Sequence, residues 1–244
     1  SIPSKNCPAK SLNRINWSSG SSPLAIVINY PGNPTTEIAD LAFYEKIVDF
    51  CKFHQIYIIS DLAYAEIYFS DTPPPSILQV KGAKDIAIEF TSLSKTFSMA
   101  GWRVGFTVGN KDLIAAITKI KSYLDYGIYT PIQVASTVAI NECTDYIDTI
   151  RTKYKERRDI LVKGLHQAGW NVPSPEASMF IWSKLPDQYQ HLSSLDFSKL
   201  LLEKAETVVS PGNGFGEMGE GYVRMALVEN KNRIRQAIRN IKKF

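Results

Sequence analysis

Four short apolar runs in the first half of the chain have the length and the continuous hydrophobicity of buried strands. They lie at residues 24–28, 56–60, 86–90 and 104–108. Between the first two runs, residues 39–54 carry apolar side chains at helical spacing on one face, which predicts a helix. Strands that alternate with a helix in this way favour an α/β fold with a mostly parallel sheet.

The second half of the chain predicts more helix and shorter strands. Helical spacing covers residues 111–123, starts again at Pro131, breaks near residues 141–145 and continues to Gln167, where Gly169 ends it. Beyond this point the expected elements are a strand at 179–183, a helix at 194–206, strands at 207–209 and 222–228, and a final helix. This mixture indicates a small α+β domain.

These patterns divide the chain into three parts. Residues 1–23 are rich in Ser, Asn, Lys and Pro with little periodicity, so we interpret them as an irregular lead-in and assign them no function. Residues 24–145 are expected to form part of a large domain, and residues 146–244 the small C-terminal domain.

Polar side chains follow the first three predicted strands, a few residues after each strand ends. Asn33 follows the first strand, Asp61 and Tyr64 the second, and Lys95 the third. Open α/β sheets bind ligands outside the carboxyl ends of their strands, so we expect these groups to gather at one edge.

The run SLSKTFSMAGWRVG at residues 92–105 sets Lys95 among hydroxyls, glycines and an arginine. A lysine amine can form an imine with an aldehyde, whereas hydroxyls and a guanidinium suit a phosphate dianion. Together with NYPGNPTT at 29–36 and SDLAY at 60–64, this run resembles the motifs of the class I/II aminotransferases. EASMFIW at 176–182 and the end of the chain are most similar to the bacterial alanine aminotransferase branch.

The resemblance implies a pyridoxal-phosphate enzyme of fold type I, with a large domain built on a mostly parallel sheet and a smaller α+β C-terminal domain. The implied reaction moves an amino group between an L-amino acid and a 2-oxo acid. Alanine with 2-oxoglutarate is our expected pair of substrates, and a homodimer the expected assembly of the full-length form.

The same resemblance implies how the cofactor is held. Lys95 would bond the cofactor and move the proton, Asp61 would keep the pyridine nitrogen protonated, and Tyr64 would bind the phenolic oxygen. Asn33 would bind the same oxygen and also contact the substrate. The residues expected to bind the phosphate are Ser92, Ser94 and Arg103.

Arg224 lies inside the predicted strand at 222–228, where a charge needs an anionic partner. The resemblance makes Arg224 the residue that binds the substrate carboxylate, and a structural ion pair is the alternative. Structural alternatives exist elsewhere too: Lys95 could be a surface lysine in a serine-rich turn, and Asp61 a turn or cap residue. The glycine-rich stretch at 210–216 suggests a mobile loop near the substrate.

The family's first part has no counterpart before Leu24. That part contains a glycine turn that binds the phosphate, a ring that stacks on the pyridine, and a tyrosine that reaches the partner subunit. We therefore expect the chain to correspond to the latter part of an aminotransferase. Two alternatives remain open: a carbon–sulfur β-lyase of the same fold, and an inactive fragment.

Composition narrows the choice of partners. The 244 residues are 44% hydrophobic with a net charge of only +4 and without long basic blocks, so neither nucleic acid nor a membrane is an expected partner. The three cysteines and three histidines are too widely spaced for a metal site, and the cysteine pattern favours a reducing cytoplasm. Tyr123, Tyr126 and Tyr129 are expected to pack in the core, and lining the substrate side is the alternative.

Overall fold

The computed structural model describes residues 23–243, which form two compact units. The first unit contains residues 23–31, Glu37–Glu66 and Thr72–Ile147, and the second contains Gly32–Thr36, Ile67–Asp71 and residues 148–243. The expected lead-in at 1–23 lies, apart from Pro23, outside the described residues. The domain boundary between residues 145 and 146 stays a prediction.

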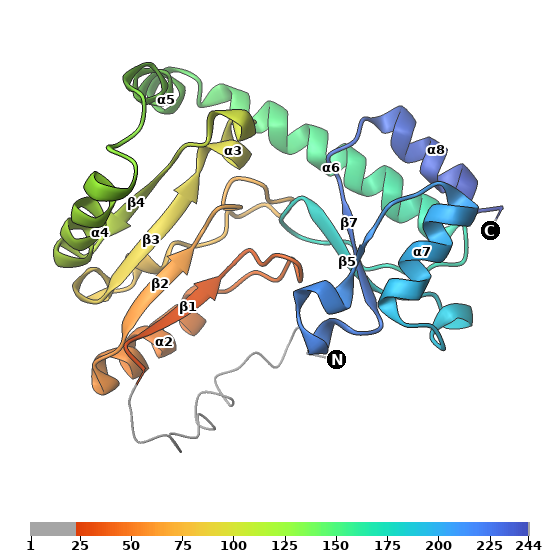
Figure 1. Ribbon diagram of the computed structural model, residues 1–244, viewed down its shortest axis with the longest axis horizontal. Coiled ribbons are helices and arrows are strands. Elements are labelled where there is room, and N and C mark those ends of the chain that lie inside the picture. Colours follow the sequence, from red (N-terminus) through yellow and green to blue (C-terminus); the bar gives the residue numbers. More distant parts are fainter. Residues whose placement is uncertain (1–22, 244) are drawn as a thin grey trace. The chain divides into compact units, whose positions relative to one another are not determined.

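A four-stranded sheet forms the centre of the first unit (Figure 1). Its strands, in order across the sheet, are β1 (Ala25–Asn29), β2 (Tyr57–Asp61), β3 (Ala87–Ser92) and β4 (Gly105–Gly109). β1, β2 and β3 run parallel, whereas β4 is antiparallel to β3. The expectation of a mostly parallel sheet is therefore confirmed, and the carboxyl ends of the first three strands share one edge.

Helix α2 (Leu41–His54) covers one face of this sheet, as the apolar spacing predicts. It begins at Asp40, whose side chain accepts a hydrogen bond from the Phe43 backbone N–H and so satisfies one unpaired donor of the first turn. Tyr44 and Val48 are buried against Ile58 of β2 in the core of this unit. Burial also raises the pKa of the Cys51 thiol to about 11, so this side chain stays protonated and behaves as an apolar residue.

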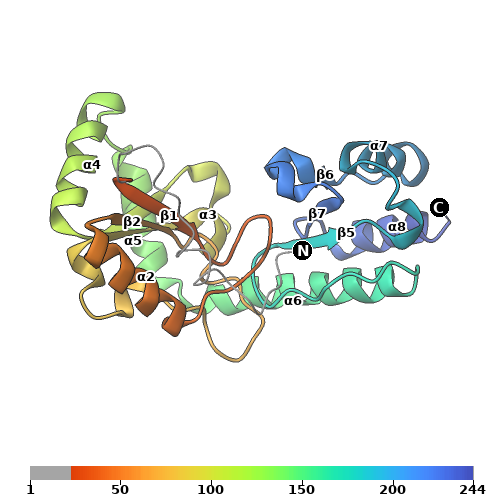
Figure 2. The ribbon, with the colours of Figure 1, turned by 90° about the horizontal axis from the view of Figure 1, so that it is seen from below.

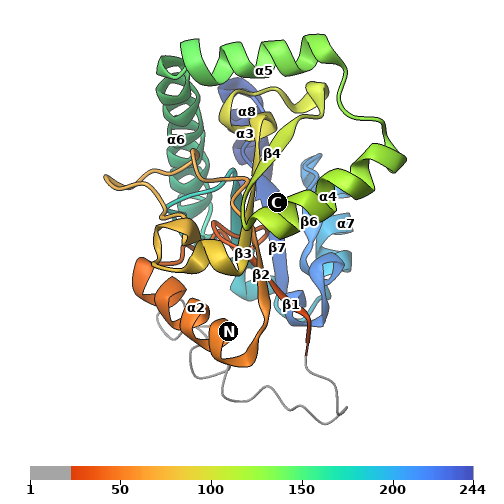
Figure 3. The same ribbon diagram turned by 90° about the vertical axis from the view of Figure 1, so that its left-hand side faces the viewer.

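Three more α-helices follow in the described part of the first unit: α3 (Leu93–Thr96), α4 (Lys111–Leu124) and α5 (Thr130–Glu142). Figure 3 shows the sheet nearly edge-on, with α2 and α4 on opposite sides of it. The expectation that Tyr123, Tyr126 and Tyr129 pack in the core is wrong, because they are 77%, 93% and 73% exposed among the described residues. Tyr123 belongs to α4, which buries none of its residues in the described part of the chain, and Tyr126 and Tyr129 lie in the connection between α4 and α5.

The described residues of the second unit form an α+β arrangement of three antiparallel strands and three α-helices (Figure 2). In chain order they are α6 (Asp145–His166), β5 (Phe180–Lys184), α7 (Ser194–Ala205), β6 (Ser210–Pro211), β7 (Tyr222–Ala226) and α8 (Lys231–Ile241). The strand expected at 207–209 is displaced to Ser210–Pro211. The reason is local: Thr207 N–H still bonds the Leu201 carbonyl and so completes the end of α7.

The core of the second unit lies where α6, α7 and α8 pack on one face of the strands. Phe197 and Leu201 of α7 are fully buried against Ile181 of β5 and Val223 of β7. Figure 2 shows α6 and α8 running alongside these strands. No helix in the described part of the chain is both long and apolar enough to cross a lipid bilayer.

Gly164 of α6 lies close to Ile238 of α8. A methyl group on Gly164 would lie 2.4 Å from Cδ1 of Ile238 and 2.7 Å from its Cγ1. We expect Gly164→Ala to lower the free energy of unfolding by about 1–3 kcal/mol through overpacking, partly offset by about 1 kcal/mol of better helix propensity. Denaturant unfolding measures the change. In an Ile238→Ala background the same substitution is expected to become neutral or stabilising, and an unchanged cost there would contradict the explanation.

Candidate functional site

The carboxyl edge of β1, β2 and β3 carries polar side chains on neighbouring strands. Asn29 pairs with Asp61 in the register of β1 and β2, and Asp61 pairs with Phe90 in the register of β2 and β3. Ser92 ends β3 two residues after Phe90. Asn29, Asp61 and Ser92 are therefore brought to one edge of the sheet, where open α/β folds bind their ligands.

Asp61 is held in a fixed orientation at this edge. Its Oδ1 accepts a hydrogen bond of 3.1 Å from the Ala63 backbone N–H. The Asn29 side-chain amide donates to the backbone carbonyl of Asp61 at 3.2 Å. No other residue that the structure describes donates to this carboxylate. Asp61 thus makes the contact expected of a turn residue. Its second carboxylate oxygen can still accept a hydrogen bond from a ligand.

Lys95 lies on the short helix α3, which begins directly after β3. Its Nζ is 5.9 Å from the centre of the Tyr64 ring, so the structure brings these two predicted residues together. Tyr64 and Ser94 are buried, at 7% and 8% exposure, and Lys95 is partly buried. The amine therefore lies over a buried aromatic ring.

The last residue of β3, Ser92, pairs with the first residue of β4, and Arg103 precedes β4 by two residues. Ser92 pairs with Gly105, and the Leu93 N–H donates to the Val104 carbonyl at 3.2 Å. A side chain on Gly105 would place Cβ 2.4 Å from the Thr91 carbonyl oxygen, so only glycine permits this close approach. The Arg103 side chain is exposed and donates to the Ala100 carbonyl at 3.0 Å.

These groups match the functional groups of pyridoxal phosphate. A lysine amine suits the aldehyde, a carboxylate suits the pyridine nitrogen, and hydroxyls with a guanidinium suit the phosphate. The first unit contains six of the predicted site residues, which are Asp61, Tyr64, Ser92, Ser94, Lys95 and Arg103. Their individual roles stay predictions.

The two remaining predicted residues lie together in the second unit. Arg224 on β7 donates from Nη1 to Oδ1 of Asn33 at 2.7 Å and from Nη2 to Oγ of Ser210 at 3.3 Å. In the strand register, Ser210 and Trp182 flank Arg224 on either side. Asn33 therefore belongs with the predicted carboxylate-binding arginine in this unit.

Sequence reasoning missed several residues that contact the predicted ones. Asn29 follows an apolar run just as Asp61 does, and that signal could have identified it. Ser210 could have been found only with the correct position of β6, since it pairs directly with Arg224. Two rings that contact the Arg224 guanidinium, Phe180 and Phe215, gave no signal beyond their hydrophobicity.

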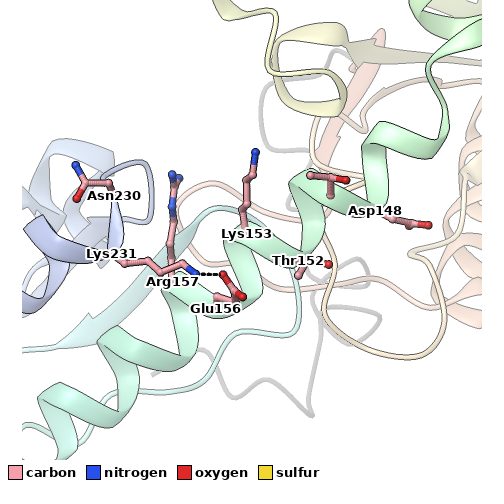
Figure 4. A pocket seen from close by; sticks show the side chains of 8 residues that line it. Asp148, Thr152, Lys153, Glu156, Arg157, Asn230 and Lys231 are labelled. Carbon is pink, nitrogen blue, oxygen red and sulfur yellow. Dashed lines mark ion pairs between the residues drawn. The ribbon is translucent and has the colours of Figure 1, made fainter.

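A separate cavity of about 610 Å³ lies along α6 beside the start of α8 (Figure 4). Lys231 and Glu156 form an ion pair there, and Arg157 donates to the Leu227 and Val228 carbonyls at 3.1 Å. None of the predicted site residues lines this cavity. Among the described residues no group of three or more His, Cys, Asp or Glu side chains could hold a metal ion.

Comparison with known proteins identifies relatives over most of the chain. A family model described as "Aminotransferase class I and II" matches residues 9–241, so the match begins within the stretch to which the sequence assigned no function. The chain is 60% identical over 222 residues to the "Putative aminotransferase AatC" of Rhizobium meliloti, covering 91% of this chain and 55% of that protein. It is 50% identical over 220 residues to the "Glutamate-pyruvate aminotransferase AlaC" of Escherichia coli, with 90% and 53% covered.

The similarity extends to further proteins and to solved structures. An LL-diaminopimelate aminotransferase of Natranaerobius thermophilus is 46% identical over 216 residues, covering 88% of this chain and 55% of that protein. Substrate-bound BacF from Bacillus subtilis matches with a TM-score of 0.85 and 36% identity over 89% of this chain and 55% of that one. An aromatic aminotransferase from Pyrococcus horikoshii matches with a TM-score of 0.89 and 28% identity over 98% and 63%. The chain spans about half the length of the curated relatives it matches.

Proposed function

The chain belongs to the class I and II aminotransferases, and we propose that it carries the cofactor-binding lysine and the substrate-binding arginine of a pyridoxal-phosphate-dependent transaminase. The family uses pyridoxal phosphate, and the solved relatives share the mostly parallel sheet of fold type I. Activity, substrates and assembly of the whole protein are part of the proposal.

The observation that carries this proposal is the common edge of the parallel strands. The strand register aligns Asp61 with the end of β1 and with Phe90 of β3, and Lys95 follows β3 on α3. Two chemically different groups that one cofactor needs, a carboxylate and an amine, are therefore attached to the ends of neighbouring strands in the first unit. The position of Tyr64 near the amine supports the same assignment.

Each residue in the first unit has a distinct proposed task. Lys95 would hold the cofactor through its Nζ atom, and the same amine would accept and return the proton that the reaction moves. Asp61 keeps a proton on the pyridine nitrogen, and Tyr64 donates to the phenolic oxygen. When bound, pyridoxal phosphate supplies an aldehyde for the amino group and a ring that withdraws electrons.

The phosphate and the substrate are proposed to bind through hydroxyls and guanidinium groups. Ser92, Ser94 and Arg103 bind the phosphate dianion, because charge-assisted hydrogen bonds of this type are strong. Arg224 binds the α-carboxylate of the amino acid, and Asn33 contributes to the substrate and phenolic-oxygen contacts. We propose alanine and 2-oxoglutarate as substrates, supported by 50% identity to AlaC. A homodimer in the cytoplasm is the proposed form of the full-length protein.

Product analysis tests this function directly. The chain is incubated with pyridoxal phosphate, alanine and 2-oxoglutarate, and pyruvate and glutamate are measured over time. We expect the two products in equal amounts. Without 2-oxoglutarate, we expect at most one equivalent of pyruvate per site and no glutamate. A parallel reaction with cysteine tests the lyase alternative: release of pyruvate together with sulfide, in the absence of any amino acceptor, would replace the proposed function with β-elimination.

A further inference from the structure

Arg224 lies on the face of the β5–β7 sheet that the helical core does not cover. Strand residues alternate between faces, and Ile181, Val223 and Met225 point into the core formed with α6, α7 and α8. Arg224 and its pairing partner Trp182 therefore project from the opposite face. This face carries a row of aromatic side chains beside a single predicted ligand-binding arginine.

Two aromatic rings contact the Arg224 guanidinium. Its central carbon is 4.3 Å from the centre of the Phe180 ring and 4.6 Å from that of Phe215. Phe180 is a buried residue of β5, whereas Phe215 comes from the short helical turn Gly212–Phe215 and is 40% exposed. Rings stacked on a guanidinium stabilise it and restrict its plane.

The Phe215 ring is itself held in place by neighbouring rings. It meets Trp182 edge-on, with ring centres 5.8 Å apart and an interplanar angle of 89°. Trp182 in turn stacks on Tyr222 at 5.1 Å and 5°. Such pairs contribute beyond their burial and fix the relative orientation of the rings. The position of Phe215 is therefore determined by strand residues on both β5 and β7.

The segment that carries Phe215 is closed tightly at its base. A methyl group on Gly212 would lie 2.0 Å from the Gly219 carbonyl oxygen, and one on Gly219 would lie 2.0 Å from the Gly212 carbonyl oxygen. Only two glycines permit this contact, which brings the two ends of the 212–219 loop together. The sequence suggests a mobile loop here, whereas the structure shows a loop with a fixed base.

The far end of the same loop is anchored on α7. The buried Ser194 hydroxyl accepts from the Gly221 N–H at 2.8 Å, and the Ser194 N–H donates to Oε1 of Glu220 at 2.6 Å. This backbone N–H, with further hydrogen bonds, lowers the pKa of the Glu220 carboxyl. Because its loop is anchored, the Phe215 ring can hold the Arg224 side chain in place.

We propose that Phe215 is a positioning residue that orients the Arg224 guanidinium for a carboxylate ligand. Asn33 and Ser210 fix two of the guanidinium nitrogens by hydrogen bonds, and the ring fixes the plane in which those nitrogens lie. A planar carboxylate binds a guanidinium best when both groups share one plane. The inference rests on the proposed role of Arg224 as the substrate-binding arginine and adds a specific residue that sets its geometry.

The first test follows the arginine itself and needs no catalytic activity. Phenylglyoxal modifies arginine side chains, and peptide mass spectrometry gives the rate for each one. We expect Phe215→Leu to change the rate at Arg224 by about two- to thirty-fold, the range expected from loss of one cation–π contact, and Phe215→Tyr to leave it unchanged. Arg158, which contacts the Phe69 ring at 4.6 Å, is the internal control and should keep its rate in all variants.

The second test separates substrate binding from chemistry. In the cofactor-loaded chain, Phe215→Leu should raise KM for the amino acid about two- to thirty-fold while kcat at saturation stays within about twofold, and Phe215→Tyr should restore KM. Thermal unfolding of both variants must match the unaltered chain. The positioning role is overturned if Phe215→Leu leaves the modification rate of Arg224 unchanged. It is also overturned if Phe215→Tyr does not keep the modification rate of the unaltered chain. Absence of transamination in the unaltered chain would instead contradict the proposed function and leave the modification result valid.

Discussion

Replacing Lys95 by alanine is expected to abolish both covalent attachment of pyridoxal phosphate and transamination. The amine is the proposed attachment point and the proposed proton carrier, and it lies directly beside the buried Tyr64 ring. Loss of proton transfer alone removes about 10²–10⁴-fold of rate, and loss of the attachment point adds to this. Visible absorbance of the cofactor-treated chain and the rate of pyruvate formation from alanine measure the two effects.

Borohydride reduction locates the attachment point independently. In the unaltered chain the label is expected on the peptide that contains Lys95, and in Lys95→Ala no other lysine should acquire it. Lys111→Ala is the matched control, because Lys111 lies exposed in the same unit at the start of α4 and should keep the absorbance, label and activity. Label on a different lysine of the unaltered chain would remove Lys95 from its role.

The edge that carries Asp61 and Ser92 was predictable because parallel strands leave a simple signature. Each parallel strand is a short apolar run in the sequence. The polar residues that follow these runs indicate which functional groups lie together at the carboxyl edge. The direction of β4 was not predictable in the same way. An apolar run has no direction, and the antiparallel pairing of Ser92 with Gly105 depends on the turn at Arg103, which adopts a left-handed conformation with φ +52°.

The surroundings of Arg224 depended on contacts that no local pattern encodes. Asn33 is 191 positions away from Arg224, and its motif predicted cofactor contacts without indicating this partner. Phe215 lies in a glycine-rich segment without periodicity, and its position depends on ring contacts with β5 and β7 and on the Gly212–Gly219 contact at the base of its loop. The three tyrosines at 123, 126 and 129 show the opposite error, since aromatic character alone predicted burial for side chains that are exposed in the described structure.

Replacing Arg224 by alanine is expected to weaken amino-acid binding about 10²-fold or more while the cofactor stays bound. A hydrogen bond to a charged group contributes about 1.5–3 kcal/mol, and a guanidinium can donate two of them to one carboxylate. The predicted cofactor ligands of the first unit are untouched by the change. Titration of the cofactor absorbance with alanine gives the dissociation constant, and the same spectrum before titration reports cofactor binding.

Arg224→Lys is the informative companion to this variant. Lysine keeps the charge but cannot form the planar fork that the hydrogen bonds to Asn33 and Ser210 hold in place, so we expect it to recover only a small part of the affinity. Full recovery of the affinity by lysine would mean that charge alone binds the substrate. The orientation of the guanidinium plane by the stacked rings would then not matter for binding. Unchanged affinity in Arg224→Ala would leave Arg224 with a structural role, in which it ties β6 and residues 32–36 to β7.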